Sequence, residues 1–356
     1  MLKARRCVRE MREYHSPLSG TNIDLRLDMN ESTTGCSPRV LAKLNRMDAH
    51  TLAQYPRRDA GEELVADFLS VAPRQLLLTN GADEAIDLLC RAYLEPENEI
   101  VIVVPTFGMY EVFAQMENAK VIRVQAGPEF NFPLQGVLDA LTDKTRIVVI
   151  CNPNNPTGVD VPRADILQVI KAAPDAAVLL DEAYFDFYGQ TMLDRVGKLP
   201  NLFVARTFSK AYGLAGMRLG LIAGDQEQMS VLRRMASPFN VNAFAIECLA
   251  EALADRQFVA DYVAQVLASR EWVRNELQQL KFKCWPSHGN FILCRFGDEK
   301  KTVLEALRAR GISLRDRPDC EGCVRITIGK QQEMERLIAE LKNVLHQPSV
   351  AKQVTR

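Results

Sequence analysis

Residues 202–223 read LFVARTFSKAYGLAGMRLGLIA, a stretch in which two short apolar runs flank a glycine-rich loop. The runs, at 202–206 and 219–223, have the length and composition of strands that are buried on both faces. The loop carries Lys210 shortly after the first run. A lysine placed among strand ends loses water, gives up its proton more easily and becomes an amine nucleophile.

Five more runs of this kind precede the stretch, and helical patterns separate them. The runs lie at 75–79, 100–104, 121–124, 146–151 and 177–180, and the helical patterns at 61–70, 82–93, 110–118, 133–141 and 163–173. Apolar runs that alternate with crossover helices indicate a mostly parallel sheet covered by helices. The sequence therefore predicts an α/β fold of three layers around a mostly parallel, seven-stranded sheet.

Beyond Arg256 the pattern changes to that of a smaller α+β unit. Helices are expected at 258–280, 302–310 and 331–346, and strands at 290–295, 312–315 and 324–328. We expect two domains. Residues 36–255 form the large one, and residues 1–35 together with 256–356 form the small one.

The composition argues against nucleic acid and membranes as partners. The 356 residues carry 44 Lys and Arg against 45 Asp and Glu, so the net charge of −1 attracts no polyanion. The apolar runs are too short to span a bilayer, and the N-terminus lacks a signal-peptide core. Nine cysteines without a framework indicate reduced thiols in a cytoplasm. Cys320 and Cys323 form a lone C-x-x-C, so no metal site is expected.

Two further motifs follow strand ends. Asn154-Asn155-Pro156-Thr157-Gly158 comes after the run at 146–151, and Asp181-Glu182-Ala183-Tyr184 comes after the run at 177–180. Ligands of parallel sheets bind at the carboxyl ends of the strands. We therefore expect Asn155, Asp181 and Lys210 to lie at one site.

These side chains match the requirements of pyridoxal 5'-phosphate. Lys210 supplies an amine that tethers the aldehyde as an exchangeable Schiff base. A buried Asp181 would keep the ring nitrogen protonated, and Asn155 and Tyr184 suit the phenolic oxygen of the ring. Each signal also has an ordinary alternative, because Asp181 could cap a helix, Asn155 could form a turn and Tyr184 could belong to the core. An ATPase metal site at Asp181-Glu182 is excluded, since the sequence has no G-x-x-x-x-G-K-[ST] loop.

The phosphate and the ring face have candidates as well. Gly81-Ala82-Asp83-Glu84 opens a helix after a strand, where free backbone N–H groups and the helix dipole favour an anion. Ser209 and Arg218 add a hydroxyl and a guanidinium group. Tyr110, after Pro105-Thr106-Phe107-Gly108, is expected to stack on the ring, with an ordinary helix residue as the alternative.

Motifs in the same order extend over nearly the whole chain. They are Tyr14, Leu27-Asp28-Met29-Asn30-Glu31, Tyr55-Pro56, Thr79–Glu84, Pro105–Tyr110, Asn154–Gly158, Asp181–Tyr184, Ser209–Gly220, Asn290-Phe291-Ile292-Leu293, Leu314-Arg315-Asp316 and Val324–Gly329. In this the chain resembles the fold-type I, class II-like aminotransferases, and among them the histidinol-phosphate aminotransferase family.

The resemblance implies a role for each motif residue. Lys210 would be the Schiff-base lysine and general base, and Asp181 the partner of the ring nitrogen. The other implied contacts are Asn155 and Tyr184 to the ring oxygen, Tyr110 to the ring face, and Ala82, Asp83, Ser209 and Arg218 to the phosphate. Tyr55 would reach the cofactor phosphate of a neighbouring subunit, so a homodimer with shared active sites is implied. Arg325, Arg315, Tyr14 and Asn30 would line the substrate pocket.

The implied reaction is a ping-pong transamination in which 2-oxoglutarate takes the amino group of a small-molecule donor. Tyr14, Arg315 and Arg325 together favour histidinol phosphate, and with it histidine biosynthesis. An aromatic amino-acid aminotransferase and a threonine-phosphate-type decarboxylase stay open, because an arginine binds a carboxylate as well as a phosphate. A non-catalytic sensor of this fold needs a DNA-binding segment ahead of Asn30, for which we expect no room.

The chain departs from the family at two places. The family usually has a proline soon after the Asn-Glu pair, whereas this chain reads Asn30-Glu31-Ser32-Thr33-Thr34-Gly35. Arg57 and Arg58 make the segment after Tyr55-Pro56 basic. The sequence does not decide whether these two arginines face a substrate phosphate or solvent.

Overall fold

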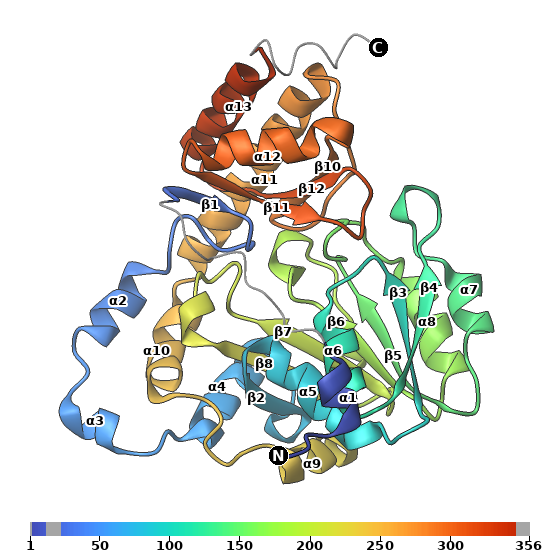
Figure 1. The fold of residues 1–356 in the computed structure, drawn as a ribbon. Coiled ribbons are helices and arrows are strands. Elements are labelled where there is room, and N and C mark those ends of the chain that lie inside the picture. The colour runs from blue at the N-terminus through green and yellow to red at the C-terminus, as the bar shows by residue number, and fades with distance from the viewer. Residues whose placement is uncertain (1, 12–22, 347–356) are drawn as a thin grey trace.

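The computed structural model of the chain describes residues 2–11 and 23–346 and contains two sheets (Figure 1). The larger sheet has the strand order β2-β8-β7-β6-β5-β3-β4. Its strands are β2 (Leu76–Asn80), β3 (Glu99–Val104), β4 (Lys120–Gln125), β5 (Thr145–Cys151), β6 (Ala177–Asp181), β7 (Leu202–Thr207) and β8 (Leu219–Gly224). Strand β8 is antiparallel to both of its neighbours, and the other pairs are parallel. The predicted α/β fold is confirmed, with every predicted strand of this sheet present.

Helices cover both faces of this sheet. One face carries α5 (Gly81–Tyr93), α6 (Met109–Met116) and α9 (Gln226–Met235), and the other carries α4 (Arg58–Leu69), α7 (Leu134–Asp139), α8 (Arg163–Ala172) and α10 (Ala243–Ala254). Along β2, the fully buried Leu77 belongs to one core cluster, while Leu76 and Leu78 belong to the other. Alternate side chains thus enter opposite cores, which explains why the strands read as continuous apolar runs.

The second sheet has the order β1-β11-β12-β10-β9 and lies above the first in Figure 1. Its strands are β1 (Leu25–Leu27), β9 (Lys283–Cys284), β10 (Phe291–Arg295), β11 (Ile312–Arg317) and β12 (Cys323–Thr327). Helices α11 (Arg256–Gln279), α12 (Lys300–Arg308) and α13 (Gln331–Leu345) share a core with it. Strand β1 pairs with β11, so the N-terminal segment joins the C-terminal sheet. The domain limits at residues 35 and 255 stay a prediction.

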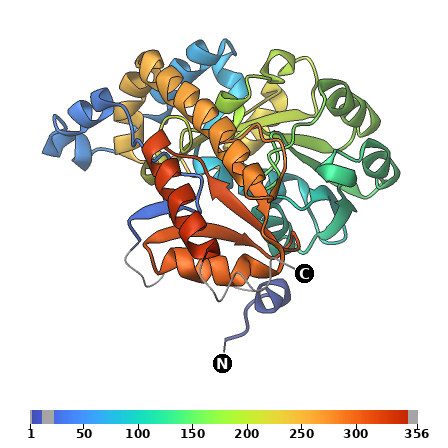
Figure 2. The same cartoon turned by 90° about the horizontal axis from the view of Figure 1, so that it is seen from above.

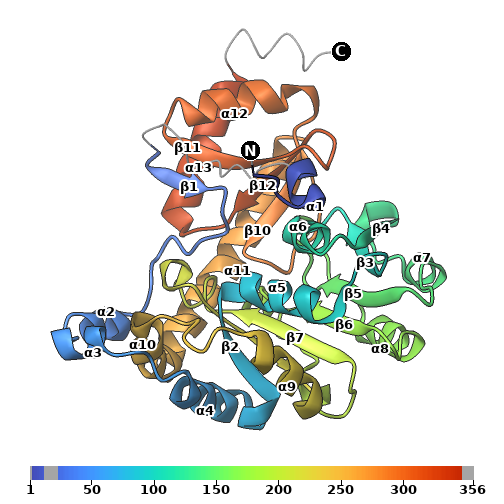
Figure 3. The same ribbon diagram turned by 60° about the horizontal axis from the view of Figure 1, so that its bottom comes forward.

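Several helices have no counterpart in the sequence prediction. Besides α9 and α10 these are α2 (Pro38–Leu44) and α3 (Ala49–Ala53), which project from one side of the molecule (Figure 2). Helix α1 (Arg6–Glu10) lies beside α6 (Figure 3), where Arg5 Nη2 donates to the backbone oxygen of Met116 at 2.6 Å. Within the described ranges, no helix combines the length and apolarity that crossing a bilayer requires.

Candidate active site

A cavity of about 1400 Å³ opens where the parallel strands end. Its walls bring together most of the predicted site residues. They are Ala82, Asp83, Asn155, Asp181, Tyr184, Ser209, Lys210 and Arg218 from the large-sheet side, together with Asn30, Arg315 and Arg325. Tyr110 and Tyr55 do not line it. Tyr14 lies outside the described residues.

Lys210 follows β7 and reaches toward the segment after β1 that carries Met29 and Asn30. Its Nζ donates a hydrogen bond to the backbone oxygen of Met29 at 3.2 Å. Burial, reinforced by the positive charge of Arg325, lowers the pKa of Lys210 from 10.5 to about 8, against the opposing effect of Glu31. The amine is therefore much closer to its neutral, nucleophilic form at physiological pH than an exposed lysine.

Asp181 is the last residue of β6 and is almost completely buried. One carboxylate oxygen, Oδ1, accepts from the backbone N–H of Ala183 at 2.9 Å. The other, Oδ2, accepts from the hydroxyl of Tyr110 at 2.5 Å. Burial raises the pKa of Asp181, and these two hydrogen bonds oppose the rise.

Tyr110 does not line the cavity, although its ring was expected to stack on the cofactor ring. It sits in the first turn of α6 with a relative exposure of 0%, and its side chain belongs to the core under the sheet. Phe107, three residues earlier in the loop between β3 and α6, lines the cavity instead. The two rings meet edge to face with centroids 5.7 Å apart. Of these two rings, that of Phe107 is therefore the one available to a ligand in the cavity.

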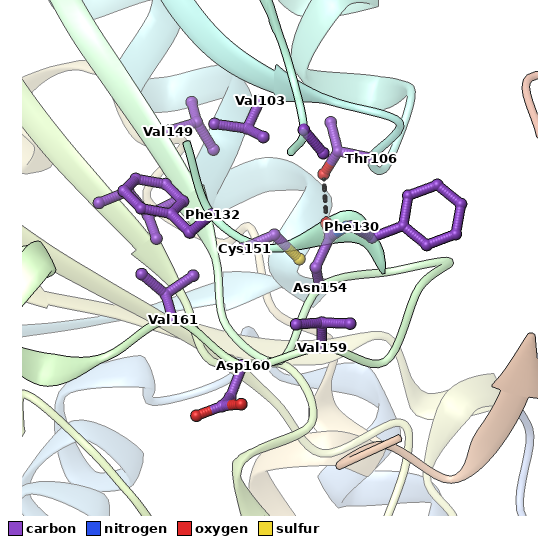
Figure 4. A pocket seen from close by; sticks show the side chains of 12 residues that line it. Val103, Thr106, Phe130, Phe132, Val149, Cys151, Asn154, Val159, Asp160 and Val161 are labelled. Carbon is purple, nitrogen blue, oxygen red and sulfur yellow. Dashed lines mark hydrogen bonds between the residues drawn. The ribbon is translucent and has the colours of Figure 1, made fainter. Parts of the chain in front are cut away.

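The loop that carries Phe107 is held to the loop that carries Asn155. Asn154 Oδ1 accepts from Thr106 Oγ1 at 2.8 Å (Figure 4). Asn154 Nδ2 donates to the backbone oxygen of Pro105 at 3.0 Å. A second cavity of about 20 Å³ lies beside this contact, with room for about one water molecule. This cavity is too small for a substrate. The two hydrogen bonds of Asn154 connect the two loops.

Arg325 on β12 is almost fully buried and its orientation is fixed. Nη1 donates to Asn155 Oδ1 at 2.7 Å, and Nη2 donates to the backbone oxygen of Asp28 at 2.6 Å. Arg315 on β11 is directly opposite Arg325 in the strand register, and both line the cavity. Two guanidinium groups on adjacent strands make this wall suitable for an anion.

Tyr184 and Asn30 form a pair on the same wall. Asn30 Nδ2 donates to the hydroxyl oxygen of Tyr184 at 2.9 Å, and Lys210 Nζ lies 5.9 Å from the centre of the Tyr184 ring. Burial raises the pKa of Tyr184 to about 12, so its hydroxyl stays protonated and can donate a hydrogen bond to a ligand oxygen.

The start of α5 and the loop before β8 together form a cradle that could hold a phosphate group. A Cβ added to Gly220 would lie 2.5 Å from the carbonyl carbon of Gly81 and 2.6 Å from the nitrogen of Ala82, so the two backbones approach closely only because residue 220 is glycine. Arg218 has a left-handed backbone (φ 52°), and its Nη2 donates to Asp83 Oδ2 at 3.0 Å. The free N–H groups of the helix, the guanidinium of Arg218 and the hydroxyl of Ser209 supply the donors that a phosphate monoester needs.

The remaining predicted residues lie away from the cavity. Tyr55 is 75% exposed and stacks on Phe239, with ring centroids 4.2 Å apart. Arg57 is exposed, whereas Arg58 forms an ion pair with Glu62 at 3.2 Å. Neither arginine therefore lines the cavity.

Cys320 and Cys323 are buried against Trp285 and Leu293. In the described part of the chain no group of three or more His, Cys, Asp or Glu side chains could hold a metal ion.

Together, a lysine of lowered pKa, a buried carboxylate and a phosphate cradle fit one cofactor. The fold and the site define a pyridoxal-phosphate-dependent enzyme of fold type I. The sequence of residues 22–341 matches the model of the family "Aminotransferase class I and II", and the chain belongs to this family.

Individual relatives agree with this assignment. The chain is 33% identical to a histidinol-phosphate aminotransferase of Dehalococcoides mccartyi. The aligned 326 residues cover 90% of each protein. It is 37% identical to a histidinol-phosphate aminotransferase of Cytophaga hutchinsonii, over 89% of this chain and 90% of the relative. The fold matches the crystal structure of the Sinorhizobium meliloti histidinol-phosphate aminotransferase in complex with pyridoxal-5'-phosphate. That match has a TM-score of 0.89 at 21% identity and covers 97% of this chain and 98% of the other.

Proposed function

We propose that this protein transfers the amino group of histidinol phosphate to 2-oxoglutarate, as a step of histidine biosynthesis. The arginine pair carries the substrate assignment. Arg315 and Arg325 lie opposite each other on the cavity wall, and two cations suit a dianionic phosphate better than a single carboxylate. The relatives named histidinol-phosphate aminotransferase support the same assignment.

In the reaction, bound pyridoxal phosphate supplies an electron-accepting ring that stabilises negative charge at the substrate Cα. Lys210 Nζ, with its pKa near 8, takes the Cα proton. The Asp181 carboxylate would face the ring nitrogen and keep a proton there. Tyr184 and Asn155 would contact the ring oxygen, and Phe107 would cover one ring face.

On the substrate side, the fixed guanidinium of Arg325 orients the anionic end of the donor. Nη1 and Nη2 are already held by Asn155 and by the backbone of Asp28, so little side-chain entropy is lost when an anion binds. An aromatic amino acid would present only a carboxylate to this wall. The aromatic aminotransferase is therefore the second candidate.

We further propose a homodimer that works in the cytoplasm. Several large apolar side chains on and around α2, α3 and α10 are exposed, namely Leu41 (52%), Leu52 (50%), Tyr55 (75%), Phe239 (50%) and Phe244 (45%). Patches of this kind mark protein interfaces, and the helices α2 and α3 project from this side of the molecule (Figure 2). All nine thiols are free, as in a reducing compartment.

A spectral titration of the cofactor-loaded protein tests the function. Histidinol phosphate, phenylalanine and threonine phosphate are added separately, without a keto acid, and the visible absorbance of the cofactor is followed. Loss of absorbance with histidinol phosphate alone supports the proposal. Loss at a lower concentration of phenylalanine would move the function to aromatic amino acids, and release of CO2 from threonine phosphate would indicate a decarboxylase.

A pair of arginine variants tests the substrate wall. Arg315→Gln should lower kcat/KM for histidinol phosphate by about ten- to a hundredfold, the worth of a charge-assisted hydrogen bond. Arg317→Gln is the matched control, because Arg317 also lines the cavity but lies opposite Cys323, not opposite Arg325, in the strand register. Equal losses in both variants would contradict the assignment.

A further inference from the structure

Tyr110 combines complete burial with a short hydrogen bond to the carboxylate of Asp181. We infer that Tyr110 is a positioning residue, because its hydroxyl holds the Asp181 carboxylate in one orientation at the cavity wall. The inference rests on the proposed function, since it concerns the carboxylate that would face the ring nitrogen.

The geometry leaves Asp181 little freedom to rotate. Tyr110 donates to Oδ2 from α6, and the backbone of Ala183 donates to Oδ1 from the loop after β6. The two donors thus come from different elements and engage different oxygens. A carboxylate held at both oxygens keeps its remaining lone pairs in fixed directions, and Asp181 lines the cavity.

The electrostatic surroundings explain why such a donor is needed. Burial raises the pKa of Asp181, and the neighbouring carboxylates Asp83 and Glu182 raise it further. Tyr110 is the side-chain donor that opposes them, aided by the backbone N–H of Ala183. Cys151 on β5 faces both groups, and burial raises the pKa of its thiol to about 12, so it adds no negative charge near neutrality.

Tyr110 remains a donor over the whole working pH range. Burial, together with the charge of Asp181, raises the pKa of the phenol well above 10, so its proton stays on oxygen. The ring is held by packing, edge to face against Phe107 and inside the core cluster under the sheet. Tyr110→Phe would therefore remove one hydrogen bond and leave the ring in place.

The test compares Tyr110→Phe with Tyr93→Phe. Tyr93 is the matched control because its hydroxyl donates to a neutral amide, Gln228 Oε1, at 2.8 Å. Equilibrium dialysis of the cofactor-free protein against pyridoxal phosphate should give a Kd about ten- to a hundredfold higher for Tyr110→Phe, the range for a hydrogen bond to a charged group. Tyr93→Phe should bind like the wild type.

A pH series gives a readout that lost packing would not change. Without the phenol donor the pKa of the folded Asp181 rises further above its unfolded value, so the stability lost relative to the wild type is larger near neutral pH than in mild acid. Melting temperatures of the cofactor-free Tyr110→Phe protein should show this dependence. The difference between Tyr93→Phe and the wild type should be independent of pH.

A double-mutant cycle decides whether Tyr110 acts through Asp181. In an Asp181→Asn background, the additional Tyr110→Phe change should have no further effect on the Kd. The inference is overturned if Tyr110→Phe binds the cofactor like the wild type, or if its loss persists undiminished beside Asp181→Asn. Failure of the wild type to bind pyridoxal phosphate in the same dialysis would overturn the proposed function as well.

Discussion

Replacing Lys210 by Met should stabilise the cofactor-free protein at neutral pH. The change keeps a long side chain of similar volume but removes a partly buried amine whose pKa is lowered to about 8. Such a lysine destabilises the folded state because folding makes its charged form less favourable. Lys210 would thus be retained for chemistry at the expense of stability.

The magnitude follows from the pKa. At about 1.4 kcal/mol per pH unit, a fall from 10.5 to about 8 means that folding with a protonated Lys210 costs about 3 kcal/mol. The variant also loses the hydrogen bond to the backbone of Met29, which reduces its gain in stability by about 1 kcal/mol. A net gain of about 2 kcal/mol is therefore expected below pH 8. Between pH 8 and 10.5 the unfolded chain binds more protons than the folded one, so the wild type gains stability with rising pH and the advantage of the variant disappears.

The assay is denaturant unfolding of the two cofactor-free proteins over this pH range. Lys301→Met on α12, where the lysine is exposed, serves as the control and should show neither the gain nor the pH dependence. If Lys210→Met has the same stability as the wild type at neutral pH and the same dependence on pH, folding does not lower the pKa of Lys210 and the reasoning is refuted.

Three further predictions concern the cradle, the interface and the basic segment. Gly220→Ala should weaken pyridoxal phosphate binding at least about tenfold in equilibrium dialysis, since its Cβ would lie 2.5 Å from a backbone carbon, whereas Gly216→Ala meets nothing within 4 Å and should bind normally. Phe239→Ser should weaken the dimer in sedimentation equilibrium, and a variant that associates like the wild type would exclude this side as the interface. Arg58→Met should lose about 2 kcal/mol of unfolding free energy, because it breaks a buried ion pair, while the exposed Arg57→Met should lose almost none; a changed cofactor Kd in either would contradict their placement away from the cavity.

The sequence alone determined the layers and the position of Lys210 at the end of a strand. Short apolar runs buried on both faces can be read directly, because every residue of such a strand must be apolar whichever neighbour it packs against. The strand-end position of Lys210, Asp181 and Asn155 follows from the same runs, since parallel strands end at one edge. These features depend on local sequence and on the rule that ligands bind at that edge.

Only the tertiary structure decided which side chains face the cavity. Phe107 and Tyr110 both follow β3, so the sequence does not show which of them faces the cavity. Helix α6 begins at Met109 and places Tyr110 in the core, while Phe107 lines the cavity. In the sequence, Arg58 likewise could face a substrate phosphate. In the structure it pairs with Glu62 on the same helix and donates a hydrogen bond to Asn240, which is far away in the sequence. The direction of a side chain at a loop–helix junction depends on the phase in which the helix packs on the sheet, and partners distant in sequence set that phase.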